Sequence, residues 1–381
     1  MQSGGTPTRR TTTRLIAIAT QCFGPDVGGI EALTTGLADN LSAAGWPIEV
    51  FADRQRSRGL DELPRGYPIH RFATLRPLRA LAKRWAIERS APREALEGLF
   101  ADSWKSVAAA PRGVRSIAAL AHGTEFPSDP SPGRTRRIRA AFARCRSIIA
   151  SSHYTAARAR DYADHTGIEV IVINPPIADL PVAGPRALAT IDAIIASRGP
   201  VVSTLARLEP RKGIDAVIRA LPLLRARHPR LVYLVAGAGA DRERLGRLAV
   251  QCGVADCVVF LGAITDAEAK AALLTRTDVY AMPSRRVGQS VEGFGIAYVE
   301  AGWYGAPSIA GNDAGAGDAV IDGRTGLLCA GSDDGAVLAA LVRLLDDEPL
   351  RKGYGAAAAD FVRKQHRWGA ALPRYLQALG L

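Results

Sequence analysis

The chain has 381 residues, 48% hydrophobic and 23% charged, so it is long enough for two domains and can bury a sizeable core. Its formal net charge is +12, and residues 1–180 alone carry 25 Lys+Arg against 17 Asp+Glu, which suits phosphorylated ligands or an anionic membrane surface. A membrane span is not expected because no apolar run reaches roughly 18 residues. Nucleic acid is not an expected partner because no nucleic-acid module is found. The five scattered cysteines offer neither a disulfide framework nor a zinc site and fit a reducing cytoplasm.

Short β-rich runs alternate with helical patterns along the chain. The first series of expected strands is 15–20 (too short for a secretory signal), 47–52, 116–122, 147–152 and 169–174. After a Pro-, Ala- and Gly-rich stretch at about 175–199, a second series follows at 201–207, 231–237, 257–262, 278–284 and 306–311. Continuously apolar strands separated by helices predict parallel sheets covered on both faces. We therefore expect an α/β protein with two doubly wound Rossmann-like domains facing across a cleft, with ligands at the carboxyl ends of the strands.

The first strand is followed by "GPDVGGIE". Gly28 and Gly29 precede a helix expected to begin near Ile30, so backbone N–H groups and the helix dipole could meet an anion there. A tight turn without any ligand is the alternative, because Gly-Gly is common in such turns.

The strand 201–207 is followed by "RLEPRKG". Arg207 and Lys212 both stand near this strand end, where an arginine fork and a lysine point charge suit a diphosphate. Their neighbours Arg211 and Glu209 are interpreted as solvated loop residues.

The segment "EGFGIAYVE" places Glu292 and Glu300 on either side of Gly293 and Gly295. A helix beginning near Gly295 would direct its N–H groups into the cleft, and the two carboxylates suit sugar and ribose hydroxyls on either side of a phosphate. A solvated helix face is the alternative for Glu300.

Three further strand ends carry candidate residues. "AHGTE" places His122 and Glu125 at the cleft, where His122 is either a structural histidine or a catalytic one. The glycine-rich stretch 311–326 also suits a phosphate, whereas His153 is interpreted as structural.

Together these residues resemble the retaining glycosyltransferases of the GT-B fold, which include sucrose- and glycogen-synthase-like enzymes and phosphatidylinositol mannosyltransferases. The resemblance covers nearly the whole chain and is strongest over residues 201–328. It implies an N-terminal acceptor-side domain at 1–180, a C-terminal nucleotide-sugar-binding domain at 181–360, and a C-terminal helix at 361–381 that returns to the first domain. The stretch "MPSRRVGQSVEGFGIAYVEA" looks most like the phosphatidylinositol mannosyltransferase branch, which uses GDP-mannose. Asp318 stands where many relatives have glutamate.

The resemblance also implies roles for the site residues. Arg207 and Lys212 should hold the donor pyrophosphate, Glu300 the ribose and Glu292 the transferred sugar, with Gly29 approaching the phosphates and His122 near the sugar. The catalytic set is then His122, Arg207, Lys212 and Glu292, and the donor-binding set is Gly28, Gly29, Arg207, Lys212, Glu292, Gly293, Phe294, Gly295, Ile296 and Glu300.

The expected activity is retaining transfer of a hexose from a nucleotide-diphosphate sugar (GDP-mannose or a UDP-sugar) to a hydroxyl of a glycan, lipid-linked or small-molecule acceptor, by same-face displacement. No metal site and no cofactor are expected, because the two cations can neutralise the leaving diphosphate and there is no Asp-x-Asp cluster. The alternatives are a nucleotide-sugar epimerase of the same fold and a non-catalytic sugar-nucleotide-binding module. A phosphorylase is disfavoured because it would be much longer.

Residues 74–90 form the remaining feature. Leu78, Leu81 and Trp85 fall on one helical face, with Arg79, Lys83, Arg84 and Arg89 around it. An ordinary core helix with a solvated basic face is one interpretation. The other is a helix that rests on anionic lipid, which would make the protein cytoplasmic and peripheral on the inner face of the membrane.

Overall fold

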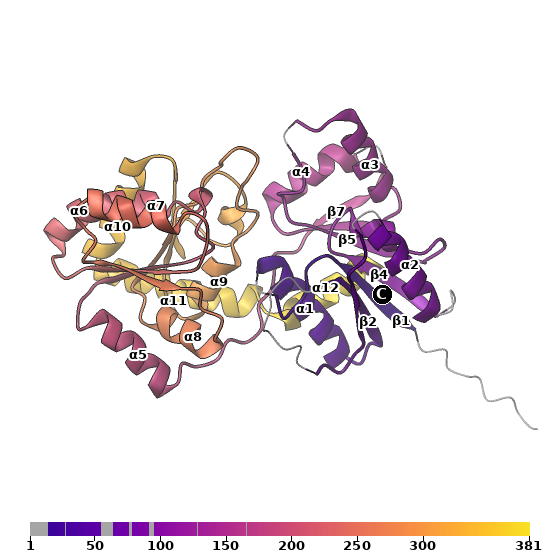
Figure 1. Cartoon of the computed structure of the whole chain (residues 1–381), viewed down its shortest axis with the longest axis horizontal. Helices are drawn as coiled ribbons and strands as arrows, with labels where there is room; N and C mark the ends of the chain where they lie inside the picture. Colours follow the sequence, from indigo (N-terminus) through magenta and orange to yellow (C-terminus); the bar gives the residue numbers. More distant parts are fainter. Residues whose placement is uncertain are drawn as a thin grey trace, which may run out of the picture.

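The computed structural model describes residues 14–26, 28–54, 64–75, 78–90, 95–127, 129–164 and 166–381. Two parallel β-sheets, each covered by helices, form two Rossmann-like domains that stand side by side (Figure 1). The predicted α/β architecture with two doubly wound domains is confirmed. In the described part of the chain, no helix has the length and apolar character needed to cross a membrane.

The first domain contains a seven-stranded sheet in the order β3-β2-β1-β4-β5-β6-β7. Its strands are β1 (Leu15–Thr20), β2 (Ile48–Asp53), β3 (Ile69–Phe72), β4 (Leu96–Ala101), β5 (Ile117–Ala121), β6 (Ser147–Ala150) and β7 (Glu169–Val172). Its helices are α1 (Gly29–Ala43), α2 (Arg79–Ser90), α3 (Pro132–Phe142) and α4 (His153–Ala163), with a 3-10 helix η2 (Ser106–Ala109).

Two strands of this sheet, β3 and β4, were not predicted. Strand β3 is a half-buried edge strand that carries His70 and Arg71, so it lacks an apolar signal. Strand β4 is buried beside β1, but Glu97 and Gly98 interrupt its apolar run. Gly98 is needed there because a Cβ atom would lie 2.8 Å from the side chain of Leu379, which packs against the strand from the end of the chain.

The second domain contains a six-stranded sheet in the order β10-β9-β8-β11-β12-β13. Its strands are β8 (Val201–Leu205), β9 (Val232–Ala236), β10 (Val258–Gly262), β11 (Val279–Met282), β12 (Ser308–Gly311) and the unpredicted β13 (Gly326–Cys329). Its helices are α5 (Pro185–Ile195), α6 (Ile214–Arg227), α7 (Arg242–Gln251), α8 (Ala267–Thr275), α9 (Ile296–Trp303), α10 (Asp334–Asp346) and α11 (Glu348–Gln365), with 3-10 helices η3 (Pro210–Lys212) and η4 (Gly315–Asp318). The stretch 175–199 is therefore not a loose linker throughout: α5 lies within it and buries Ile191 and Ile195 against the second sheet.

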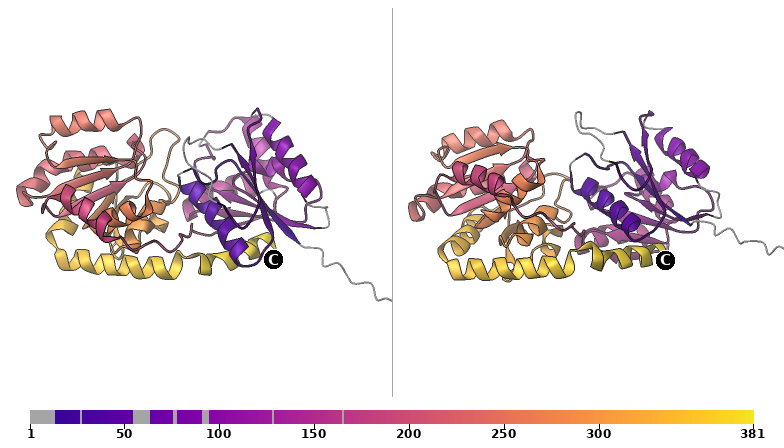
Figure 2. Two further views of the ribbon diagram at one scale, coloured as in Figure 1. Left: turned by 60° about the horizontal axis from the view of Figure 1, so that its bottom comes forward. Right: turned by 90° about the horizontal axis from the view of Figure 1, so that it is seen from below.

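The last helix, α12 (Trp368–Leu379), belongs structurally to the first domain. Figure 2 shows α11 and α12 running along one side of the molecule, from the second domain to the first. Trp368, Tyr375 and Leu379 are buried in the first domain's core, and Ser147 donates a hydrogen bond to the carbonyl of Ala378 at 2.7 Å. The chain thus passes between the domains twice. The two passages touch where the Ile177 N–H donates to the His366 carbonyl at 2.8 Å.

Candidate active site

The carboxyl ends of strands from both sheets meet at the domain boundary. A Cβ atom on Gly293 would lie 2.0 Å from the carbonyl oxygen of His122, and one on Gly29 would lie 3.5 Å from Ile296 Cδ1. These are contacts between the first domain and the second. Residues that follow the strands β1, β5 and β11 therefore lie in one interdomain region.

Glu292 is the centre of a chain of charged groups at the end of β8. Its Oε2 accepts hydrogen bonds from Lys212 Nζ and from Arg211 Nη1, the latter at 2.9 Å. Arg211 Nε also pairs with Glu209 Oε2 at 3.0 Å, and Glu209 Oε1 pairs with Arg207 Nη1 at 2.9 Å. Three cations and two carboxylates leave this cluster with one excess positive charge, which favours an anionic ligand.

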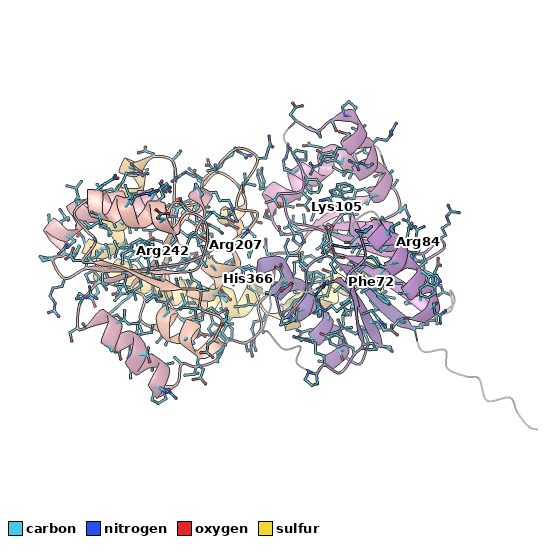
Figure 3. The ribbon with its side chains drawn as sticks, viewed as in Figure 1. Phe72, Arg84, Lys105, Arg207, Arg242 and His366 are labelled. Atoms are coloured by element: carbon cyan, nitrogen blue, oxygen red, sulfur yellow. The ribbon has the colours of Figure 1, made fainter. Side chains whose placement is uncertain are left out.

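The two ends of this cluster differ in exposure. The Arg207 side chain is 71% exposed and Lys212 is buried. Figure 3 shows Arg207 on the side of the second domain that faces the first. Arg207 can therefore reach a ligand without breaking a buried contact, whereas Lys212 is held in place by Glu292.

Burial changes the acid–base behaviour of the inner pair. Burial lowers the pKa of the Lys212 ammonium, because the charged form loses its hydration. Burial alone would raise the pKa of Glu292, but the positive charges of Lys212 and Arg211 outweigh it, and the pKa of Glu292 lies below its usual value. Glu292 is therefore an ionised carboxylate near neutral pH, and its Oε1 accepts no hydrogen bond from the residues that the structure describes.

The interpretation of Arg211 as a solvated residue is wrong, whereas the Glu209 side chain is 32% exposed. Arg211 is only 8% exposed and links both carboxylates of the cluster. The tight turn of η3, which ends at Gly213 with φ of 71°, brings two consecutive cations inward. Sequence spacing identified one of these two cations and missed the other.

Two helix N-termini point into the same region. Helix α1 begins at Gly29, one residue earlier than predicted, and α9 begins at Ile296, with Gly295 as its N-cap at φ of 93°. A side chain at Gly295 would be strained, and its Cβ would lie 2.4 Å from the Tyr298 ring. Because Gly29 and Ile296 lie next to each other, the N-termini of the two helices are close together, and the positive ends of their dipoles suit a phosphate group.

Phe294 has a different environment from its glycine neighbours. Its side chain is 3% exposed and packs in the core of the second domain, with its ring centroid 5.6 Å from that of His366. Only the backbone of Phe294 is available to bind a nucleotide-sugar donor.

Glu300 lies on α9 and is paired with a residue that the sequence did not single out. Its Oε1 accepts from Lys270 Nζ of α8 at 2.5 Å, and the Glu300 side chain is 15% exposed. It is therefore not on a solvated helix face. Lys270 gave no signal in the sequence, because an isolated lysine near a helix start is ordinary.

His122 is oriented by two contacts. Its Nε2 lies 2.9 Å from the carbonyl oxygen of Asp102, which can only accept, so Nε2 carries the proton and, in the neutral ring, Nδ1 is left as an acceptor. Its backbone N–H donates to Glu125 Oε1 at 2.7 Å. Glu125 therefore supports the loop, and Asp102 is a further residue that sequence reasoning missed.

The glycine-rich stretch 311–326 forms the turn η4 and joins the two domains. The Gly315 N–H donates to the Glu292 carbonyl at 2.9 Å. Asp318 Oδ2 accepts from the backbone N–H of His153 at 3.0 Å and from Asn174 Nδ2 at 3.0 Å, and lies 2.7 Å from His153 Nδ1. Asp318 thus binds the N-terminus of α4 in the first domain.

Comparison with known proteins agrees with this geometry. The family model "Glycosyl transferases group 1" matches residues 192–361, and "Glycosyltransferase Family 4" matches residues 27–180. A Corynebacterium glutamicum GDP-mannose-dependent monoacylated alpha-(1-6)-phosphatidylinositol monomannoside mannosyltransferase is 32% identical over 279 residues, 70% of this chain and 71% of that protein. Fold and site thus define the class of GT-B glycosyltransferases. The chain belongs to the group 1, family 4 glycosyltransferases.

Other similar proteins point the same way. The GDP-mannose-dependent alpha-(1-6)-phosphatidylinositol monomannoside mannosyltransferase of Mycolicibacterium smegmatis is 42% identical over 182 residues, 46% of this chain. That match spans about half of the relative, 47% of its length. The solved structure of sucrose-phosphate synthase from Thermosynechococcus elongatus covers 96% of this chain and 98% of its own, with a TM-score of 0.79 and 21% identity, which shows the common fold.

Proposed function

We propose that the protein is a retaining glycosyltransferase that moves mannose from GDP-mannose to a hydroxyl of a lipid-linked acceptor. The observation that carries this proposal is the charge cluster around Glu292, with its excess positive charge beside two converging helix N-termini. The choice of sugar and acceptor rests on the names of the relatives described above, which are GDP-mannose-dependent mannosyltransferases acting on phosphatidylinositol mannosides.

We assign the residue roles from the family resemblance, and position and charge support them. Arg207 and Lys212 bind the diphosphate, the backbone of Gly28, Gly29 and residues 293–296 supplies N–H donors to it, and Glu300 binds the ribose. Glu292 Oε1, which accepts no hydrogen bond within the described part of the chain, accepts from a hydroxyl of the transferred sugar. His122 Nδ1 is a second acceptor for that sugar.

The reaction is a same-face displacement. The glycosidic C–O bond to the diphosphate breaks, the acceptor hydroxyl oxygen forms the new bond on the same face, and the leaving phosphate oxygen takes the hydroxyl proton. Arg207 and Lys212 stabilise the negative charge that develops on the leaving group, and each such contact contributes about 3 kcal/mol to transition-state stabilisation. Because cations of the chain neutralise this charge, transfer requires no metal ion and no cofactor.

Product analysis tests the proposal. Purified protein with radiolabelled GDP-mannose should label a phosphatidylinositol mannoside acceptor, and omitting the acceptor should abolish the labelled lipid. Conversion of the donor to another nucleotide sugar without acceptor would support the epimerase alternative instead. Donor binding without turnover for any sugar would support the binding-module alternative.

Contact with an anionic membrane is the second part of the proposal, and helix α2 carries it. Of the nine large hydrophobic side chains exposed in the described residues, four lie between Leu75 and Trp85. Leu78 is 51% exposed, Leu81 56% and Trp85 61%. The interpretation of these residues as the buried face of a core helix is therefore wrong.

Two basic side chains of α2, Arg84 and Arg89, accompany this apolar face. Arg84 lies on the side of the first domain away from the second (Figure 3), and Arg89 stacks over the Trp85 ring with its Cζ 4.6 Å from the ring centroid. Cations beside an exposed apolar face favour an anionic surface, so we place the protein peripherally on the inner face of the membrane.

Vesicle co-sedimentation tests the membrane contact. The double variant Leu81→Gln/Trp85→Gln should lose binding to phosphatidylglycerol vesicles, whereas the control Leu223→Gln/Val250→Gln, which changes exposed apolar residues of the second domain, should bind normally. Equal binding by both double variants, or binding that high salt does not weaken, would contradict the assignment.

A further inference from the structure

Four polar residues stand in a row at the carboxyl ends of four neighbouring strands in the first sheet. In the strand order β2-β1-β4-β5, Asp53 and Thr20 end the first two strands, and Asp102 and His122 follow the other two. The Thr20 hydroxyl has two acceptors for its single proton, Asp102 Oδ2 at 2.9 Å and the Cys22 carbonyl at 2.7 Å. His122 Nε2 donates to the Asp102 carbonyl at 2.9 Å. The row therefore leads by direct hydrogen bonds to the predicted sugar-side histidine.

Lys83 of helix α2 joins this row from the opposite end. The sequence grouped Lys83 with surface cations, but its side chain is only 4% exposed. Its Nζ donates to the Thr20 carbonyl at 2.5 Å and pairs with Asp53 Oδ1 at 2.7 Å. The ammonium group thus holds the ends of β1 and β2 together.

Asp102 extends the network to the donor side of the site. Its Oδ2 accepts from the Gln21 N–H at 2.5 Å, and its Oδ1 accepts from the Ser106 hydroxyl. Gln21 begins the loop that leads to Gly28 and Gly29. One carboxylate therefore fixes the start of this loop, while the backbone carbonyl of the same residue orients His122.

We propose that Lys83 is a positioning residue for the transfer reaction: acting through Thr20 and Asp102, it sets the orientation of the His122 ring and the start of the 21–29 loop. This role rests on the proposed transferase function. Lys83 itself is not proposed to contact a substrate. Because small displacements of positioned groups reduce rates strongly, losing this contact should act on turnover more than on nucleotide binding, which involves the second domain.

Three variants separate positioning from stability. Lys83→Met removes the hydrogen bond to the Thr20 carbonyl. Arg79→Met is the matched control, because Arg79 Nη1 also pairs with Asp53, at 2.7 Å from Oδ2, but makes no contact with Thr20. The double variant Asp53→Asn/Lys83→Met restores the charge balance but not the contact. We expect kcat to fall at least tenfold in Lys83→Met and in the double variant, and less than twofold in Arg79→Met, with Kd for GDP changed less than twofold throughout. Recovery of kcat in the double variant, or an equal loss in Arg79→Met, would overturn the proposal.

A readout that needs no turnover accompanies the kinetics. Nitrogen-15 NMR of histidine-labelled protein, with His122 assigned by a His122→Gln variant, should show the Nε2–H tautomer in the parent chain and a tautomer mixture in Lys83→Met. Unchanged His122 signals in Lys83→Met would overturn the positioning role. If Lys83→Met shows this tautomer change but the parent protein transfers no sugar from any donor, the proposed function is overturned and the positioning contact stands.

Discussion

Replacing Glu292 and Glu300 by glutamine should change nucleotide binding in opposite directions. Both acids belong to the same nine-residue segment, but Glu292 neutralises two buried cations, whereas Glu300 pairs with Lys270 at a partly exposed position. If the charge cluster receives the diphosphate and Glu300 receives the ribose, the first substitution should tighten GDP binding and the second should weaken it.

The magnitudes follow from the contacts. Glu292→Gln raises the net charge of the cluster from +1 to +2. A unit charge about 6 Å from a phosphate attracts it by roughly 3 kcal/mol at an effective dielectric constant of 20, and salt reduces this attraction. We expect GDP to bind about tenfold more tightly, or about 1.4 kcal/mol. Breaking a buried ion pair costs about 3–5 kcal/mol, and since glutamine keeps one hydrogen bond, stability should fall by about 2–3 kcal/mol. Glu300→Gln should weaken GDP by about 1–2 kcal/mol through its lost ribose hydrogen bonds.

Calorimetric titration of both variants with GDP and GDP-mannose, together with unfolding of the free proteins, measures these effects. Glu292→Gln should also reduce turnover by about 10²-fold, because its carboxylate no longer serves the transferred sugar. Weaker GDP binding in Glu292→Gln would refute the assignment of the cluster to the diphosphate. Unchanged GDP affinity in Glu300→Gln would refute the ribose assignment.

Arg207→Ala should reduce transfer at least 10²-fold without changing Tm, because its exposed pair with Glu209 contributes little stability. Lys212→Ala should reduce both transfer and Tm, because Lys212 is paired with the buried Glu292. Kinetics and calorimetry of the two purified variants check this. Transfer should survive excess EDTA, and restoration of lost activity by a divalent ion would contradict the metal-independent mechanism. Burial lowers the pKa of His366 to about 4, below its unfolded value of about 6.5, so the stability present above pH 6.5 is lost as the pH falls toward 4. Urea unfolding should show a loss of about 2 kcal/mol between pH 7.5 and 5 from this group, and His366→Phe should remove that part of the acid sensitivity; an unchanged pH dependence would disprove it.

The fold could be predicted because most strands carry continuous apolar runs. The misses have local causes: Gly98 makes room for Leu379, which is distant in sequence, and the half-buried strand at His70 and Arg71 lacks an apolar signal. A contact with a remote segment leaves no periodic pattern in either segment.

The candidate site was predicted through its glycines and acids, whose spacing is local. The pairing of charges was not predictable in the same way, since Arg211 and Lys83 look like surface cations until the turn of η3 or the face of α2 directs them inward. Lys270 and Asp102 were missed because each acts on a partner from another strand or helix.

The position of α12 has a consequence for the order in which the chain folds. Residues 368–379 complete the core of the domain that begins at Leu15, so the contacts that finish this domain span nearly the whole chain, whereas the second domain is built from one continuous segment. During synthesis the second domain can close its core first, and the first must wait with an apolar groove open until Trp368 and Tyr375 emerge. Pulse proteolysis of a purified chain that ends at Arg367 should therefore find the second domain protected and the first domain cleaved.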